Sequence, residues 1–316
     1  MKKRRSEIMS LDLLDPYLVD VPRPIIGAKT VQIVIFREVL DYTVLRTEET
    51  RELNTVVTPL SVSRAEDVRR VAFLGGKQKA VESRELERML RTAGEEAGRG
   101  GLDCHLKDKL CLNCPRCALF GGTNVDSASE KIANIKHRIE YGTAFSLLPF
   151  EEIEEAITFN AIDDQTQKTG QALGTRYAVR PSTVFPSIVT LKSVTERELV
   201  LTLKTLLAAK NYGGETRIGG DIRNTIVGIA GGWEEIITPL ELTLELYDRR
   251  EELSGEAVAE ILKKYQEYVG NPSKTKVLTP EEVDKVVKEA ASMLLDKEFL
   301  DRAYADVAEY RKQQKG

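Results

Sequence analysis

All four cysteines of the chain lie within 14 residues, and their spacing is typical of a metal site. Cys104 precedes a C-x-x-C-x-x-C run that is formed by Cys111, Cys114 and Cys117. Four thiolates at this density can hold one zinc ion tetrahedrally, with Zn–S bonds of about 2.3 Å. Because four sulfur ligands would leave no coordination position for water, we expect a structural rather than a catalytic metal.

The cysteine cluster also permits other interpretations. His105 could replace Cys104 as the fourth ligand, because two adjacent residues would not bind one ion without strain. The thiols could instead form disulfides or stay free, in an oxidising or hyperthermophilic setting. An iron–sulfur cluster of the ferredoxin type would need a further cysteine about where Gly121 stands, so zinc is the better prediction.

Composition and charge narrow the class of protein. The 316-residue chain has a formal net charge of −4, 41% hydrophobic residues and no apolar stretch of the roughly 20 residues that a membrane span needs. We therefore expect a cytoplasmic protein with no membrane partner. From Lys168 to Arg223, nine basic residues stand against four acidic ones, whereas residues 224–316 hold 13 basic and 19 acidic residues. This asymmetry suits a polyanion bound on one face, although chance variation in solvated charge could also produce it.

Hydrophobic periodicity and capping signals predict the elements that position these residues. Runs of β-branched residues predict strands at 30–46, 132–148, 183–194 and 222–230. Caps and helical periodicity predict helices at 63–66, 81–93, 195–211 and 254–269, and two more that begin at Thr238-Pro239 and Thr279-Pro280. The polar run 160–177 predicts an extended hairpin or loop. The β–α–loop–β order at 183–230 fits half of a ferredoxin-like sheet with helices on one face.

Basic side chains on one predicted helix could contact successive phosphates. Arg84, Arg88 and Arg91 share a face of the helix at 81–93, because their spacing is i, i+4 and i+7. The alternative is a solvated face on which Glu85 pairs with Arg88 and Glu87 pairs with Arg91.

Two glycine pairs and one strand offer further phosphate contacts. The glycines at 75–76 and 213–214 permit close approach of backbone N–H groups to a phosphate, although such pairs also simply end helices. Alternation along the strand at 132–148 would place Lys136 and Arg138 on one side, opposite His137 and Tyr141.

Short motifs along the chain resemble the RAMP superfamily of CRISPR proteins. They are F-L-G-G-K at 73–77, C-x-x-C-x-L-F-G at 114–121, N-A-I-D at 160–163 with Thr166 and Gly170, V-R-P at 179–181 before T-V-F at 183–185, and Y-G-G at 212–214 with Arg217, Gly219 and Gly220. Their order is similar to that of the backbone subunits that polymerise along a guide RNA. The metal insertion, the size and the helical extension look most like the backbone subunit of type I-D Cascade. Residues from Gly231 onward match no part of the superfamily pattern.

The resemblance implies an α+β protein with a ferredoxin-like (RRM-like) core sheet, a zinc-binding insertion, a thumb hairpin and a C-terminal helical extension. The core would comprise 1–62 and 119–235 with the thumb at about 159–182, the insertion 63–118 and the extension 236–316. The metal would be held by Cys104, Cys111, Cys114 and Cys117. The residues expected to bind RNA are Lys77, Lys79, Arg84, Arg88, Arg91, Lys136, Arg138, Lys168, Arg176, Arg180, Gly213, Gly214, Arg217 and Arg223.

The implied function is that of a non-catalytic, crRNA-binding backbone subunit of a type I-D-like antiviral complex. Its partners would be single-stranded guide RNA, target nucleic acid through base pairing, further copies of itself and other subunits of the complex. One alternative is a backbone subunit that also cleaves the target strand through metal-dependent acidic residues, for which Asp41, Asp163 and Asp164 are candidates. Guide processing would point to His137. The remaining alternative is a zinc-stapled protein-interaction module.

Overall fold

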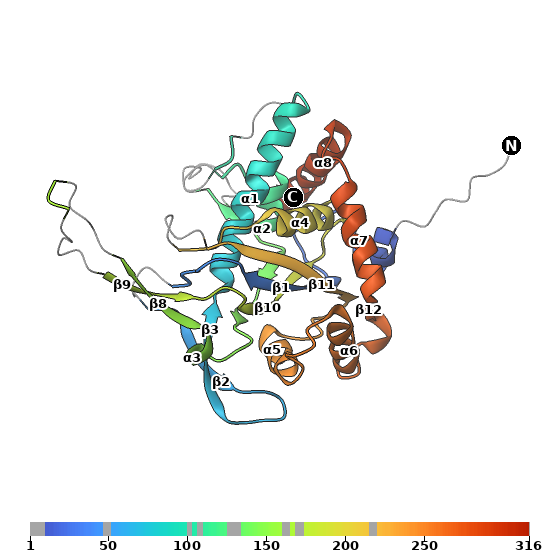
Figure 1. Cartoon of the computed structure of the whole chain (residues 1–316). Helices are drawn as coiled ribbons and strands as arrows, with labels where there is room; N and C mark the ends of the chain where they lie inside the picture. The colour runs from blue at the N-terminus through green and yellow to red at the C-terminus, as the bar shows by residue number, and fades with distance from the viewer. Residues whose placement is uncertain are drawn as a thin grey trace.

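The computed structural model of the chain describes residues 10–46, 52–99, 103–105, 110–124, 134–159, 165–167, 174–214 and 220–315. Its centre is an antiparallel five-stranded sheet with the strand order β12-β11-β1-β10-β6 (Figure 1). The strands are β1 (Thr30–Val39), β6 (Ile139–Tyr141), β10 (Val184–Lys192), β11 (Ile222–Gly232) and β12 (Lys276–Val277). β1 lies in the middle, where Ile33 is paired with Val189 of β10 and with Ile229 of β11.

Helices cover both faces of this sheet, as Figure 1 shows. On one side lie α1 (Gly75–Glu96), α4 (Glu196–Ala208), α7 (Pro280–Ser292), α8 (Lys297–Lys315) and the 3₁₀ helix η1 (Ser10–Tyr17). On the other side lie α5 (Pro239–Asp248) and α6 (Gly255–Gln266), and the short 3₁₀ helix η2 (Pro272–Lys274) follows α6. The helices that connect the central strands, α1 and α4, both lie on the first side, whereas α5 and α6, which follow β11 in the chain, cover the second.

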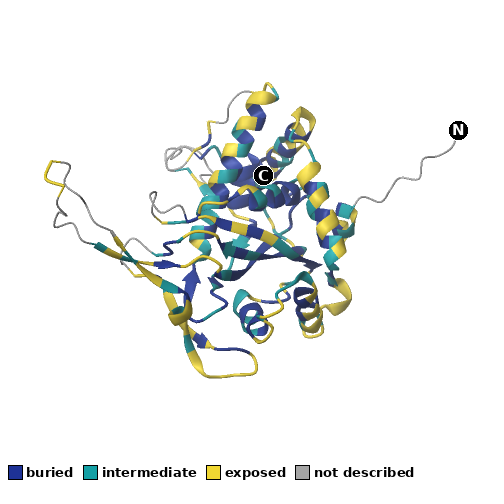
Figure 2. Cartoon of the chain, in the orientation of Figure 1, coloured by how far each residue is buried: buried dark blue, intermediate teal, exposed yellow. Residues whose placement is uncertain are grey.

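The residues of β1 explain why both faces are covered. Val31, Ile33 and Ile35 point into the core under α1, α4 and α7, whereas Val34 points into the core under α5 and α6. A strand with apolar side chains on both faces must be buried on both, because burial of each large aliphatic side chain contributes about 1.5–3 kcal/mol. Figure 2 shows the resulting buried layer along the sheet.

Most predicted helices are confirmed, and their capping residues act as expected. Capping boxes begin α4 at Thr195, α5 at Thr238 and α7 at Thr279, and Ser254 caps α6. Each cap of this kind contributes about 1 kcal/mol. The predicted box at Ser63 is wrong, because residues 60–66 form the turn of a hairpin between β2 (Thr55–Pro59) and β3 (Asp67–Phe73).

The predicted strand at 132–148 is also wrong as one element. Its described part holds three short strands in three different sheets: β5 (Asn134–Ile135), which pairs with β4 (Gly122–Thr123), then β6, and then β7 (Ala144–Phe145), which pairs with β3. The break at residues 136–138 coincides with the inward turn of Arg138, whose backbone N–H donates to the carbonyl of Leu119 at 2.8 Å. The long first strand ends at Val39 instead of residue 46.

A hairpin extends away from the body, and its first strand begins at Glu154, before the expected start at about 159. Its strands are β8 (Glu154–Phe159), preceded by the short helix α3 (Phe150–Ile153), and β9 (Gly174–Val179) (Figure 1). The candidates Asp163, Asp164 and Lys168 between these strands lie outside the described residues. No helix in the described part of the chain is both long and apolar enough to cross a membrane.

Candidate metal centre and nucleic-acid interface

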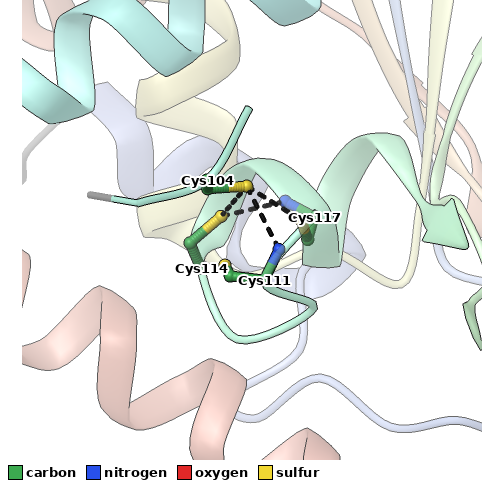
Figure 3. A group of neighbouring side chains, drawn as sticks. All are labelled: Cys104, Cys111, Cys114 and Cys117. Carbon is green, nitrogen blue, oxygen red and sulfur yellow. Dashed lines mark hydrogen bonds between the residues drawn. The ribbon is translucent and has the colours of Figure 1, made fainter. Parts of the chain in front are cut away.

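The four cysteine sulfurs converge on one point, as Figure 3 shows. All four Sγ atoms lie within 4.8 Å of one another. The Sγ of Cys104 is 3.5 Å from that of Cys117 and 3.7 Å from that of Cys114. A tetrahedral ion with Zn–S bonds of 2.3 Å needs sulfurs about 3.8 Å apart, so the arrangement fits one metal ion. The separations exceed the disulfide bond length of about 2.05 Å, and all four thiols are free.

Local backbone geometry sets the sulfur positions. Cys114 is the N-cap of the short helix α2 (Pro115–Phe120), and its Sγ accepts from the N–H of Cys117 at 3.4 Å. The Sγ of Cys104 accepts from the N–H of Cys111 at 3.5 Å, and Leu112, with a left-handed φ of 56°, lies in the turn between Cys111 and Cys114. Backbone donors of this kind favour thiolates over thiols, which is what a metal ligand requires.

A buried cation beside the cluster supports a charged thiolate site. Arg116 is 4% exposed, and no carboxylate pairs with it among the described residues. Its Nη1 lies 4.0 Å from the Sγ of Cys117, and its Nη2 donates to Ser83 at 3.0 Å. A buried guanidinium beside four neutral thiols would be costly, whereas four thiolates around a divalent ion have a net charge of −2, half of which the guanidinium can balance.

His105 does not join the four sulfurs. Its side chain is 46% exposed, and its Nδ1 lies 3.7 Å from a carboxylate oxygen of Asp103. Cys104, by contrast, is buried in the cluster, so the structure brings Cys104 and not His105 to the other three cysteines.

The segment that holds the four cysteines, described at residues 103–105 and 110–121 and called the cysteine loop from here on, packs against the C-terminal helix α8. Cys104, Cys114 and Cys117 share a small apolar core with Val307 and Tyr310 of α8. Arg91 of α1 contacts the loop from another side, because its Nη2 donates to the carbonyl of Cys104 at 3.3 Å and to Glu87 at 2.7 Å.

The three α1 arginines differ in their surroundings. Arg84 is exposed, Arg88 is exposed and lies 3.6 Å from Glu85, and Arg91 is half-buried. The ion pairs at i+3 and i+4 that the sequence offered as the alternative are therefore present for Arg88 and Arg91.

Two glycine turns that are far apart in sequence lie side by side. Gly75 and Gly76 begin α1, and a Cβ on Gly75 would stand 2.2 Å from the carbonyl oxygen of Tyr141, so only glycine fits there. The N–H of Gly214 donates to the carbonyl of Val44 at 3.0 Å, and a Cβ on Gly214 would lie 3.7 Å from the Nζ of Lys77. We call residues 75–77 and 213–214 the glycine-turn surface.

The base of the β8–β9 hairpin adjoins the glycine-turn surface through one short segment. Thr43 and Val179 exchange backbone hydrogen bonds of 3.0 and 2.8 Å, and the next residue, Val44, accepts from Gly214. Arg180 follows the hairpin and is exposed. The fold therefore places three predicted phosphate contacts in a row: the start of α1, the turn at 213–214 and the hairpin base.

The remaining basic candidates are scattered, and one assignment must be corrected. Arg138 is buried and donates to Glu198 and to the carbonyls of Ala118 and Ser193, so it has no surface to offer RNA. Lys136 and Arg176 are exposed and half-buried respectively, and Arg223 is exposed and pairs with Glu38. Lys168 and Arg217 lie outside the described residues.

Lys79 is half-buried, and its charge lies near His137, which is exposed over part of its surface. Burial lowers the pKa of Lys79, and the nearby charge of Arg116 lowers it further. Burial, followed by the charge of Lys79, also lowers the pKa of His137. His137 is therefore neutral at pH 7.

Carboxylate clusters suited to metal-dependent cleavage are not found in the described part of the chain. There, the four cysteines are the one group of three or more His, Cys, Asp or Glu side chains that could share an ion. Asp41 is exposed, and its carboxylate accepts from the N–H of Tyr42 at 2.7 Å.

Two features of the site could not be located from sequence reasoning. For Arg116, the sequence offers one signal of a role at the metal site, which is its position between Cys114 and Cys117. Tyr212 lies in the predicted Y-G-G turn, but the buried partners of its hydroxyl come from β1, α1 and β11, which only the fold brings together.

Comparisons with known proteins place the chain among CRISPR proteins. The model of the Csc2 CRISPR family matches residues 17–310, so the chain belongs to the Csc2 family. No curated protein sequence matches it.

Two solved structures share the fold. The crystal structure of Thermofilum pendens Csc2 is 24% identical, with a TM-score of 0.60 over 93% of this chain and 92% of that one. A chain of a CRISPR RNA-guided surveillance complex in a pre-nicking state is 10% identical, with a TM-score of 0.50 over 83% of this chain and 100% of that one. A chain of another CRISPR RNA-guided surveillance complex is 14% identical, with a TM-score of 0.47 over 78% and 86%.

Proposed function

We propose that this chain is the crRNA-binding backbone subunit of a type I-D-like CRISPR interference complex. Several copies would line up along one guide RNA, together with other subunits of the complex, and would present the bases for pairing with the target. Membership of the Csc2 family supports a role in CRISPR defence. The observation that carries the RNA-binding role is the row formed by the α1 start, the turn at 213–214 and the hairpin base.

The chemistry of the glycine-turn surface suits a phosphate. The N–H groups at the start of a helix have no i−4 partner within it, and no side chain caps α1 at Leu74. The N–H of Lys77 donates to the carbonyl of Leu74 at 3.0 Å, so the backbone donors offered to a phosphate are those of Gly75 and Gly76. The N-terminus of a 22-residue helix also carries a partial positive charge. Lys77 adds a full charge beside Gly214, so backbone donors and an ammonium group face the same space.

Covered sheet faces favour phosphate contacts over base stacking. An RRM-like protein usually stacks bases on the open face of its sheet. Here α5 and α6 occupy that face, so the sheet offers no such platform. Contacts to the RNA backbone leave the base edges exposed, which is what pairing to a target requires.

We also propose that the core is ferredoxin-like. The chain order β1-α1-β6-β10-α4-β11 and the sheet order β11-β1-β10-β6 support this, because they match a β-α-β-β-α-β unit with split βαβ connections. α1 then belongs to the core, where Leu86 and Leu90 pack against the sheet. The cysteine loop is the insertion, and α5–α8 form the extension.

In this proposal the metal is a structural zinc ion that is held by Cys104, Cys111, Cys114 and Cys117. It would fix a loop that has few apolar side chains of its own and dock it on α8. The chain itself would be non-catalytic.

A charge placed at the start of α1 tests the proposed function. A Cβ on Gly76 would meet no atom within 4 Å, so Gly76→Asp fits without strain, and a carboxylate in the first turn of a helix is stabilising. We expect Gly76→Asp to weaken binding of a labelled single-stranded RNA about tenfold, because its charge repels phosphate (~1.4 kcal/mol).

Gly76→Asn is the matched control, because it has the same shape without the charge. It should bind RNA within about threefold of the unmodified protein, a difference below 1 kcal/mol. Equal affinity of the Asp and Asn variants, both folded, would remove the α1 start from the RNA site.

A further inference from the structure

A buried polar network lies directly beneath the glycine-turn surface. It consists of Arg37 of β1, Glu82 of α1, Tyr141 of β6, Asn224 of β11, and Tyr212 in the turn before β11. Arg37 and Glu82 are both fully buried, and Arg37 Nη1 lies 2.8 Å from Glu82 Oε1. We call these five residues the buried network.

The hydroxyl of Tyr212 uses its full hydrogen-bonding capacity in this network. It accepts from Arg37 Nη1 at 3.0 Å and from Asn224 Nδ2 at 2.8 Å, and it donates to Glu82 Oε1 at 2.7 Å. A phenol has one donor and two acceptor positions, so none is left over. Burial, followed by the charge of Glu82, raises the pKa of Tyr212 far above its usual value, so the hydroxyl stays protonated.

The network contacts both turns of the glycine-turn surface. Tyr212 immediately precedes Gly213, and its backbone N–H donates to the carbonyl of Gly220 at 3.1 Å. On the other side, the hydroxyl of Tyr141 donates to Glu82 at 2.6 Å, and the carbonyl of Tyr141 contacts Gly75 at the start of α1. Tyr212, which precedes Gly213, and Tyr141, whose carbonyl contacts Gly75, both donate to the carboxylate of Glu82. The same buried carboxylate is therefore linked to both turns.

Stability alone is a weak reason for such a network. Burying an ion pair costs several kcal/mol of desolvation, and apolar residues of similar size are often at least as stable. Arg37 also keeps two buried N–H groups, Nε and Nη2, without a hydrogen-bond partner among the described residues. What the network does supply is a fixed distance between three strands, a helix and a loop.

We propose that Tyr212 is a positioning residue for RNA, which holds the turn at 213–214 beside the start of α1 so that both contact the same stretch of RNA backbone. This inference rests on the proposed function. Tyr212 itself touches no RNA, because it is buried, and it acts through Gly213 and Gly214.

The variant Tyr212→Phe tests this inference, because it removes only the hydroxyl and leaves the Arg37–Glu82 pair. We expect single-stranded RNA affinity to fall five- to tenfold. Tyr265→Phe is the control. The hydroxyl of Tyr265 on α6 also donates to a carboxylate, Glu245 Oε1 of α5, at 3.2 Å. These two helices cover the opposite face of the sheet. Tyr265→Phe should leave RNA affinity within twofold, with a smaller loss of melting temperature, because Tyr265 is only half-buried.

A double-mutant cycle separates positioning from general loosening. If Tyr212 acts by aligning the two turns, Gly76→Asp should cost less in the Tyr212→Phe background than in the unmodified protein, by at least threefold in affinity. Independent effects that multiply would overturn the inference. An unchanged affinity for Tyr212→Phe, with Gly76→Asp still impaired, would also overturn it while leaving the proposed function intact. A failure of the unmodified protein to bind RNA would instead reject the proposed function.

Hydrogen exchange of the unmodified protein decides the matter if Tyr212→Phe does not fold. Added RNA should slow exchange at the amides of residues 212–214 and 75–78 together. Slower exchange at 75–78 without any change at 212–214 would contradict a shared stretch of RNA backbone.

Discussion

Individual arginines of this chain have different structural roles, and the sequence alone does not show which arginine has which role. Arg138 and Arg116 are buried and hold other parts of the protein, whereas Arg84 and Arg180 are exposed. Burial decides their roles, and burial depends on elements that come from distant parts of the chain.

Loss of Arg138 should lower the stability of the folded protein and should not act through the proposed RNA site. Arg138→Met would leave the buried carboxylate of Glu198 without its partner, which typically costs about 3–5 kcal/mol. We expect the free energy of unfolding in denaturant to fall by that amount. Arg302→Met breaks an exposed pair with Glu298 and should cost roughly 0–1 kcal/mol. A similar small loss for both variants would show that Arg138 is not buried as described.

Loss of Arg116 should weaken the metal site. Arg116→Met keeps much of the side-chain volume but removes the charge near Cys117, so zinc should be lost to a chelator at roughly 10–100-fold lower chelator concentration. Arg197→Met, which breaks a pair with Asp306 of α8, is the control and should keep its zinc. Equal retention by both variants would contradict a charge-balancing role for Arg116.

At the scale of elements, helix starts and the cysteine cluster could be predicted, because residues close together in the sequence determine them. The capping boxes at Thr195, Thr238 and Thr279 set helix starts within a few residues, so α4, α5 and α7 could be predicted. The cysteine spacing likewise predicted a cluster. The box at Ser63 failed, because the segment that contains it closes the hairpin between β2 and β3, where the N–H of Ser61 donates to the carbonyl of Arg64.

Elements whose form depends on distant partners could not be predicted. The stretch 132–148 looked like one strand, but its parts pair with β4, β10 and β3. The residues of the glycine-turn surface were predicted one by one from a family resemblance. Their convergence and the network beneath them depend on strand order, which no local pattern contains.

Removal of the metal should loosen the cysteine loop and its contact with α8. Fresh protein should contain one zinc ion per chain by elemental analysis. After chelation, hydrogen exchange should speed up at residues 110–121 and around Val307 and Tyr310, because these share one small core. Peptides from α5 and α6 should not change. Absence of any metal in fresh protein would contradict the structural zinc site.

At the scale of the whole molecule, coverage of the sheet on both sides limits how the proposed RNA binding could occur. With α5 and α6 on one face and α1, α4 and α7 on the other, the proposed binding is left to the edges, turns and hairpin. Such contacts depend on phosphate charge and not on base identity.

No cleavage of a target strand is expected from the chain alone. In the described part of the chain, Asp41 belongs to no group of three or more His, Cys, Asp or Glu side chains that could hold an ion. Incubation of guide, labelled target and protein with Mg²⁺ or Mn²⁺ should leave the target intact. Divalent-metal-dependent products that disappear in Asp41→Ala would show that the backbone subunit is also a nuclease.

The most direct measurement is fluorescence anisotropy of a labelled single-stranded RNA, titrated with the protein at two salt concentrations and with polyglutamate as competitor. Binding through phosphates predicts similar affinity for unrelated sequences, little displacement by polyglutamate, and a logarithmic salt slope of about −0.7 for each phosphate contacted. No binding at low salt would contradict the RNA-backbone role. Equal displacement by polyglutamate would instead indicate a module that binds acidic proteins.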